Sequence, residues 1–279
     1  MEVSHDGIRL HVEVEGGAGP PVVFIHGLTS SLETWSWLPS RITGGRRIIR
    51  LDLRGHGGSD HAPGTYLLER YGADLVAVLR EVAGEPAVLV GHSLGGSVAW
   101  WTAQNHLELV RAALLEDPVL YTDWGPDEVA GLERDRDAIR AEQEAGTDPE
   151  ELVRREAAEP VERPGRDGLT WGEVVDPADL LPEMRAILAA DPETMTAMAN
   201  RSTLAAIDVE TPVTVPVLLL AAEAEAAFSE EHERRLSQTQ PGVEMIRVAG
   251  SAHGIHAEID PRPIFAARLA EFLDRHAPA

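Results

Sequence analysis

The chain has 279 residues, 43% of them hydrophobic, which suits one large α/β domain or a core with a smaller insert. Its 47 acidic residues face 24 basic ones, all of them Arg, and the resulting net charge of −23 predicts a surface that repels nucleic acid and anionic membranes. The absence of cysteine excludes disulfides, Fe–S clusters and thiol nucleophiles, and with no signal peptide or membrane span in the pattern we expect a cytoplasmic protein.

Short apolar runs alternate with helix-prone stretches along most of the chain. Residues 8–15 alternate apolar and polar side chains, the pattern of a half-exposed strand. Buried strands are predicted at 22–25, 47–51, 87–90, 110–115, 215–220 and 243–248, and helices at 67–82, 94–105, 230–238 and 263–276. This alternation predicts an α/β fold with a mainly parallel sheet flanked by helices on both faces.

The alternation stops between Pro118 and about Pro212, where the chain is charged and helix-rich. Asp148-Pro149 and Asp191-Pro192 resemble helix starts, with Asp as the cap and Pro at the first helical position. An insertion of this length is too long for a plain loop. We therefore predict a core in two parts, 1–118 and 213–279, with a helical cap inserted at 119–212.

The segment Gly91-His92-Ser93-Leu94-Gly95 follows an apolar strand and opens a helix-prone stretch. In that setting Gly-x-Ser-x-Gly is typical of a nucleophile elbow, a sharp turn that exposes a serine above the sheet. The helix after the turn would aim its free N–H groups and positive dipole end at the reaction site. Ser93 is therefore the predicted nucleophile.

A serine hydroxyl needs a base, a carboxylate that orients the base, and donors for the oxyanion. His253 is the best candidate base because it lies on a small-residue loop after the last predicted strand, and His256 is the reserve. The histidine spacing suggests no metal site, and no glycine-rich fingerprint for a phosphate or a dinucleotide is present. We therefore expect neither a metal nor a cofactor.

Four motifs, in this order, resemble those of the capped serine branch of the α/β-hydrolase superfamily. They are Phe24-Ile25-His26-Gly27-Leu28, Asp52-Leu53-Arg54-Gly55-His56-Gly57-Gly58-Ser59, Gly91-His92-Ser93-Leu94-Gly95-Gly96 and Ala249-Gly250-Ser251-Ala252-His253. The resemblance spans nearly the whole chain and implies a sheet with a helical cap. It also implies Ser93 as nucleophile, His253 as base, and an oxyanion hole formed by the main-chain N–H groups of Leu28 and Leu94.

The resemblance leaves the acid of the triad open. The usual Gly-x-x-Asp pattern after the strand ending at Leu220 is replaced by Ala222-Glu223-Ala224-Glu225, which puts Glu225 at the position of the aspartate. Some members of the superfamily, including a lactonase branch, draw the acid from the end of the preceding strand, where Glu116 aligns. Asp117 lies one residue further. Glu225, Glu116 and Asp117 are thus weighed in that order.

The cap contributes the predicted pocket roof. Met184, Met195 and Met198 fall within fifteen positions, and methionine adapts to irregular apolar shapes. Trp124, Trp171, Met184 and Met195 are therefore candidate substrate-binding residues.

The residues and the resemblance together predict a cofactor-independent serine hydrolase of carboxylic esters or lactones, acting on a medium-sized hydrophobic substrate. The partner expected is a small molecule, with the protein a monomer or a homodimer. The alternatives are a C–C bond hydrolase acting on a diketone, a cyclase-like biosynthetic enzyme, and a non-catalytic binding protein of the same fold.

Overall fold

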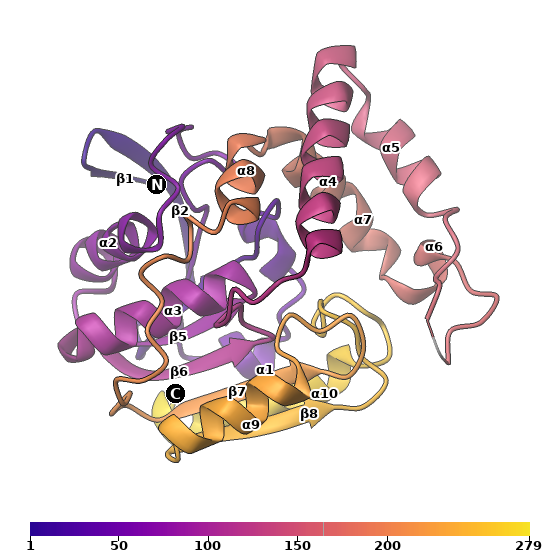
Figure 1. Ribbon diagram of the computed structural model, residues 1–279. Helices are drawn as coiled ribbons and strands as arrows, with labels where there is room; N and C mark the ends of the chain where they lie inside the picture. The colour runs from indigo at the N-terminus through magenta and orange to yellow at the C-terminus, as the bar shows by residue number, and fades with distance from the viewer. Residues whose placement is uncertain (164) are drawn as a thin grey trace.

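The computed structural model describes residues 1–163 and 165–279, and its centre is one eight-stranded sheet (Figure 1). The strand order is β1-β2-β4-β3-β5-β6-β7-β8. β1 pairs antiparallel with β2 and β2 with β4, whereas all other neighbours are parallel. The bounds are β1 (Glu2–His5), β2 (Ile8–Gly16), β3 (Pro21–Ile25), β4 (Arg47–Leu51), β5 (Ala87–His92), β6 (Val110–Glu116), β7 (Val217–Ala222) and β8 (Val243–Val248).

The central strands are apolar throughout because both faces of the sheet are covered by helices. Along β5, Ala87 and Leu89 belong to the core on one face, and Val88 and Val90 to the core on the other. The first core packs under α2 (Leu68–Val78), α3 (Leu94–Asn105) and α9 (Glu230–Thr239), and the second under α1 (Ser40–Thr43) and α10 (Arg262–His276). The predicted mainly parallel sheet flanked by helices is thus confirmed.

Among the described residues, five helices lie between β6 and β7, and four of them project from the core at the side toward which β5 and β6 point (Figure 1). These four are α4 (Pro126–Ala145), α5 (Pro149–Glu156), α6 (Trp171–Val174) and α7 (Pro177–Ala189), and the fifth is α8 (Glu193–Ala199). Asp148 caps α5 as predicted, accepting a hydrogen bond from the N–H of Glu150 at 2.8 Å. The inserted segment is therefore a helical cap over the carboxyl ends of the strands.

The sequence pattern missed two short elements and misplaced the bounds of others, such as the strand predicted at 215–220, which is β7 at Val217–Ala222. β1 is a four-residue edge strand, and α1 is a single turn, so neither carries a long periodic signal. The predicted helix at 67–82 is α2 followed by one π-helical turn at Leu79–Ala83. Within the described residues, no helix is long and apolar enough to cross a membrane.

Candidate active site

Ser93 occupies a strained turn between β5 and α3. Its backbone has φ 52° and ψ −116°, a conformation that side-chain-bearing residues rarely adopt. The flanking glycines make the turn possible: a Cβ on Gly91 would come within 2.3 Å of the carbonyl oxygen of Gly95, and a Cβ on Gly95 within 2.3 Å of that of Ile25. The turn therefore holds the hydroxyl at the N-terminus of α3, on the side of the cap.

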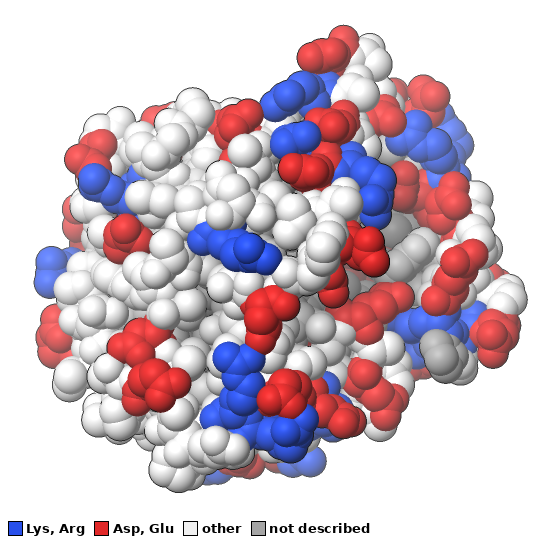
Figure 2. Space-filling model, in the orientation of Figure 1, with Lys and Arg blue, Asp and Glu red and all other residues white. Residues whose placement is uncertain are grey.

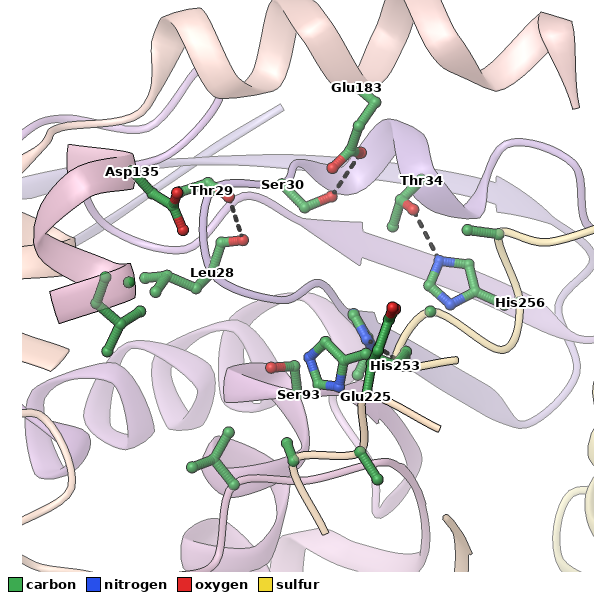
Figure 3. Close-up of a pocket in the computed structure, with 18 of the residues that line it drawn as sticks. Leu28, Thr29, Ser30, Thr34, Ser93, Asp135, Glu183, Glu225, His253 and His256 are labelled. Atoms are coloured by element: carbon green, nitrogen blue, oxygen red, sulfur yellow. Dashed lines mark hydrogen bonds between the residues drawn. The ribbon is translucent and has the colours of Figure 1, made fainter. Parts of the chain in front are cut away.

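His253 lies beside Ser93 although 160 residues separate them in sequence (Figure 3). It comes from the loop after β8, and its side chain is about one-third exposed. Its Nδ1 donates a hydrogen bond to Oδ2 of Asp117 at 2.6 Å. With Nδ1 carrying the proton, Nε2 is left as the acceptor, which is the tautomer that a base facing a serine needs.

Asp117 is the carboxylate that contacts the candidate base. Its side chain is fully buried, immediately after β6. Besides His253, its oxygens accept hydrogen bonds from the backbone N–H groups of Ala222 at 3.2 Å, Ala227 at 2.8 Å and Phe228 at 3.3 Å. Four donors satisfy this buried carboxylate and fix its direction, so it holds the His253 ring in one orientation.

Glu116 does not contact His253, which corrects its candidacy as the triad acid. Its two oxygens accept hydrogen bonds from the backbone N–H of His256 at 2.8 Å and from Nδ1 of His256 at 2.7 Å. Successive residues of a strand point to opposite sides, and Asp117 adds a left-handed turn with φ 40°. The neighbouring carboxylates therefore reach two different histidines. His256, the reserve base, has its Nε2 engaged with Thr34 Oγ1 at 2.8 Å, so neither ring nitrogen is free.

Glu225, the leading candidate for the acid, is also displaced from that position. Its side chain is about half exposed and lies 3.8 Å from Nη1 of Arg163, and the described residues include no hydrogen bond between it and His253. The loop that carries Glu225 folds over Asp117 and donates to it through Ala227 and Phe228. The carboxylate of Asp117, immediately after β6, therefore already occupies the place that an acid from this loop would take.

The pKa of Glu116 depends on its burial and on two neighbouring imidazoles. Burial alone would raise the pKa of Glu116, but the imidazoles of His256 and His92 outweigh it and hold that pKa below its usual value. Burial lowers the pKa of His92 to about 3, so its ring is neutral. Its Nε2 then donates to the carbonyl oxygen of His253 at 3.1 Å. His92 thus supports the loop of the candidate base.

The loop that would supply the first oxyanion donor is held by His26, which is fully buried. Its Nε2 accepts a hydrogen bond from the N–H of Leu53 at 3.0 Å, and its Nδ1 donates to the carbonyl of Gly27 at 2.7 Å. Because Nε2 accepts a hydrogen bond, the ring is neutral, in accord with a pKa that burial lowers. Leu28 follows directly and lines the cavity beside Ser93, while Leu94 begins α3. Leu28 thus borders the same cavity as Ser93, and Leu94 directly follows Ser93 in the chain.

A cavity of about 970 Å³ lies between the core and the cap and contains Ser93 and His253. Of the predicted substrate-binding residues, Trp124, Trp171 and Met184 line it. Met195 is not a lining residue; it is buried in α8, and Met198 of the same helix lines the cavity instead. The methionine cluster indicated the right part of the cap but not the helix face.

The sequence singled out no carboxylate of the cap, although several of them line this cavity, among them Glu183 and Asp135. Figure 3 shows Glu183 of α7 reaching to Ser30, with Asp135 of α4 beside Thr29. Ser30 Oγ donates to Glu183 Oε2 at 3.3 Å. Charged residues on the cap helices belong to no sequence motif. Only the folded structure shows which of them face the cavity. Among the described residues, no cluster of His, Cys, Asp and Glu could hold a metal ion.

A family model described as the alpha/beta hydrolase family matches residues 22–267. The chain belongs to this family. A protein of Mesorhizobium japonicum named 2-(acetamidomethylene)succinate hydrolase is 28% identical over 270 residues, which is 96% of this chain and 92% of that protein. The structure of the enol-lactonase from Burkholderia xenovorans LB400 has a TM-score of 0.75 at 19% identity and covers 98% of this chain and 99% of its own.

A thermophilic esterase from Thermogutta terrifontis has a TM-score of 0.72 at 21% identity, covering 99% of this chain and 98% of its own. At such identities the two solved structures establish the shared fold alone. The chain is therefore a member of a hydrolase family with the fold of known lactonases and esterases.

Proposed function

We propose that this protein is a serine hydrolase that cleaves a carboxylic ester or lactone of a medium-sized hydrophobic substrate through an acyl-enzyme. The observation that carries the proposal is the arrangement of three side chains, Ser93, His253 and Asp117. His253 lies beside Ser93 and donates from Nδ1 a 2.6 Å hydrogen bond to the buried carboxylate of Asp117. This order of hydroxyl, imidazole and carboxylate makes a weakly nucleophilic serine reactive near neutral pH.

The first half of the reaction transfers the acyl group to the enzyme. Ser93 Oγ forms a bond to the carbonyl carbon as its proton passes to Nε2 of His253, and the N–H groups of Leu28 and Leu94 stabilise the tetrahedral oxyanion. The carbon–oxygen bond of the ester then breaks, and His253 returns the proton to the leaving alkoxide. A lactone opens without losing a fragment.

The second half restores the serine. Water gives a proton to His253 Nε2 and adds to the acyl carbon, and the bond to Ser93 Oγ breaks as that oxygen regains the proton. The products are a carboxylic acid and an alcohol, or one hydroxy acid from a lactone. Asp117 holds the imidazole of His253 in place while the charge of that ring changes.

The cavity supports a hydrophobic substrate of moderate size. Its volume lies near the upper end of the range of small-molecule sites, and Leu132, Val175 and Leu180 contribute apolar surface. The whole-length likeness to the Mesorhizobium protein favours a second candidate, hydrolysis of 2-(acetamidomethylene)succinate. That compound carries two carboxylates, and no Arg among the described residues lines the cavity to pair with them, so the ester or lactone is preferred.

A screen of p-nitrophenyl esters of short and long acids, aromatic lactones and 2-(acetamidomethylene)succinate tests the proposal. We expect turnover of an ester or a lactone by the wild-type protein and none by Ser93→Ala above the solvent background. If 2-(acetamidomethylene)succinate were the only compound turned over, the ester or lactone would be refuted as the substrate class. Equal turnover by wild type and Ser93→Ala would refute Ser93 as the nucleophile.

A further inference from the structure

The charged side chains around the cavity are all of one sign. Eight of the 47 acidic residues line it, whereas none of the 24 Arg residues does so within the described part of the chain. In Figure 2 the hollow below α4 is bordered mainly by carboxylates. A low-dielectric cleft lined by one sign of charge concentrates ligands of the opposite sign. The cavity therefore discriminates among ligands by charge as well as by size.

Half of these carboxylates are compensated from outside the cavity. Arg partners are present for Asp123, Glu156, Asp179 and Glu225. The described residues include no ion pair of an Arg with any of the other four, Glu33, Glu128, Asp135 and Glu183, although the charge of Arg134 acts on Asp135. The cavity thus keeps negative charge that the protein itself does not neutralise.

Among these four carboxylates, Glu183 contacts the loop of Leu28, Thr29 and Ser30, which lines the same cavity as Ser93. It is half-buried on α7, and Figure 3 shows it pointing at the loop that follows Leu28. Its one described partner is the Ser30 hydroxyl at 3.3 Å, a weak contact for a carboxylate. Burial raises the pKa of Glu183, and the nearby imidazole of His256 and the Ser30 hydroxyl offset this effect only in part. A cation placed in the cavity would supply a strong partner.

Two features independent of the acidic residues suit this space to a ligand. The cavity of about 970 Å³ directly adjoins Ser93 and His253, and the indole rings of Trp124 and Trp171 belong to its wall. Indole faces attract ammonium groups as well as apolar ones, with Trp the strongest of the aromatic side chains. A substrate with an apolar body and a cationic group would therefore satisfy the indoles and the carboxylates together.

We propose that the substrate of this hydrolase carries an ammonium group next to its apolar acyl chain, and that Glu183, assisted by Asp135 at the rim, selects it over anionic analogues. This inference rests on the proposed function, because it assigns the substrate class of the same site. It makes Glu183 a specificity-determining residue. The reaction at Ser93 is the same for a cationic and for a neutral ester.

Three p-nitrophenyl esters matched in length test the proposal. The cationic ester is the 4-(trimethylammonio)butyrate, its neutral carbon isostere is the 5,5-dimethylhexanoate, and the anionic ester is the monoglutarate. We expect kcat/KM for the cation to exceed that for the isostere about tenfold at low salt, and the anion to fall below the isostere. In 0.5 M NaCl the ratio of kcat/KM between the cationic ester and its isostere is expected to shrink, because salt screens the attraction between the carboxylates and the ammonium group.

The variant Glu183→Gln, combined with Asp135→Asn, is expected to abolish most of the cation-to-isostere ratio. Glu81→Gln is the matched control for Glu183→Gln alone, because Glu81 is exposed, lies outside the cavity, and its substitution removes the same single charge. It should keep the wild-type ratio. A wild-type ratio at or below one, or a ratio that the double variant leaves unchanged, would overturn the proposal.

Binding to Ser93→Ala separates this inference from the proposed function. Calorimetric titration of that variant with the cationic ester and the isostere measures charge preference without turnover. Tighter binding of the cation with no hydrolysis by wild type would sustain the charge selection and refute the esterase. Hydrolysis by wild type with equal binding of the two esters would support the esterase and refute the charge selection.

Discussion

Two imidazole–carboxylate pairs lie side by side at the carboxyl ends of β6 and β8, and they differ in what the imidazole can still do. In the first pair, His253 gives Nδ1 to Asp117 and keeps Nε2 toward Ser93 at the edge of the cavity. In the second pair, His256 is buried, with Nδ1 bound to Glu116 and Nε2 to Thr34. The same chemical groups thus form a reactive pair where one nitrogen is free and a structural pair where both are engaged.

The largest expected effect comes from Asp117→Asn. An amide in this place offers an acceptor less suited to Nδ1–H and favours the wrong imidazole tautomer, so we expect kcat to fall about 10⁴-fold for a neutral ester. Steady-state kinetics and a far-UV spectrum measure turnover and folding together. Glu225→Gln removes the charge of the rival acid and is expected to have a far smaller effect. A collapse of activity in Glu225→Gln with near-normal turnover in Asp117→Asn would reverse the assignment.

The first pair shows why the fold was more predictable than the acid. Gly-x-Ser-x-Gly and the small-residue loop before His253 are local signals, and they located Ser93 and His253. Glu116 and Asp117 are adjacent in sequence, so their separation depends on the strand register and on one left-handed residue. Glu225 was favoured by position, but the direction of its loop depends on the backbone donors that close over Asp117. No spacing rule contains that information.

The second pair is expected to act on stability. Glu116→Gln removes one charge of a buried pair and leaves His256 without its carboxylate, so we expect the free energy of unfolding to drop by about 3 kcal/mol. Urea unfolding at pH 7 measures the loss, with Glu81→Gln as the exposed control. Turnover per folded molecule should fall much less than in Asp117→Asn.

The unfolding free energy lost in Glu116→Gln should depend on pH. Because the pKa of Glu116 is lowered in the folded protein, its contribution is complete above the ordinary value of 4.5 and disappears as the pH falls through the lower folded value. The stability difference between wild type and Glu116→Gln is therefore expected to narrow below pH 4.5. A difference that is constant with pH would contradict an ionised Glu116.

His92 lies between the two pairs, with ring centroids 4.7 Å from His253 and 5.1 Å from His256. Its pKa of about 3 means that the folded protein leaves it neutral where the unfolded chain protonates it, from about pH 6.5 downward. Its contribution to stability should therefore be present above pH 6.5 and fall by about 1.4 kcal/mol per pH unit below it. We expect His92→Asn to show a shallower decline in unfolding free energy between pH 6.5 and 4.5. An equal slope would mean that His92 is not held neutral.

Covalent labelling tests the reactive pair most directly. Wild type, Ser93→Ala and Asp117→Asn would be treated with a fluorophosphonate at pH 7.5 and the adducts located by peptide mass spectrometry. We expect a single adduct on Ser93 in wild type, none in Ser93→Ala, and much slower labelling in Asp117→Asn. An unlabelled wild type, or an adduct that forms equally fast without Asp117, would contradict the account.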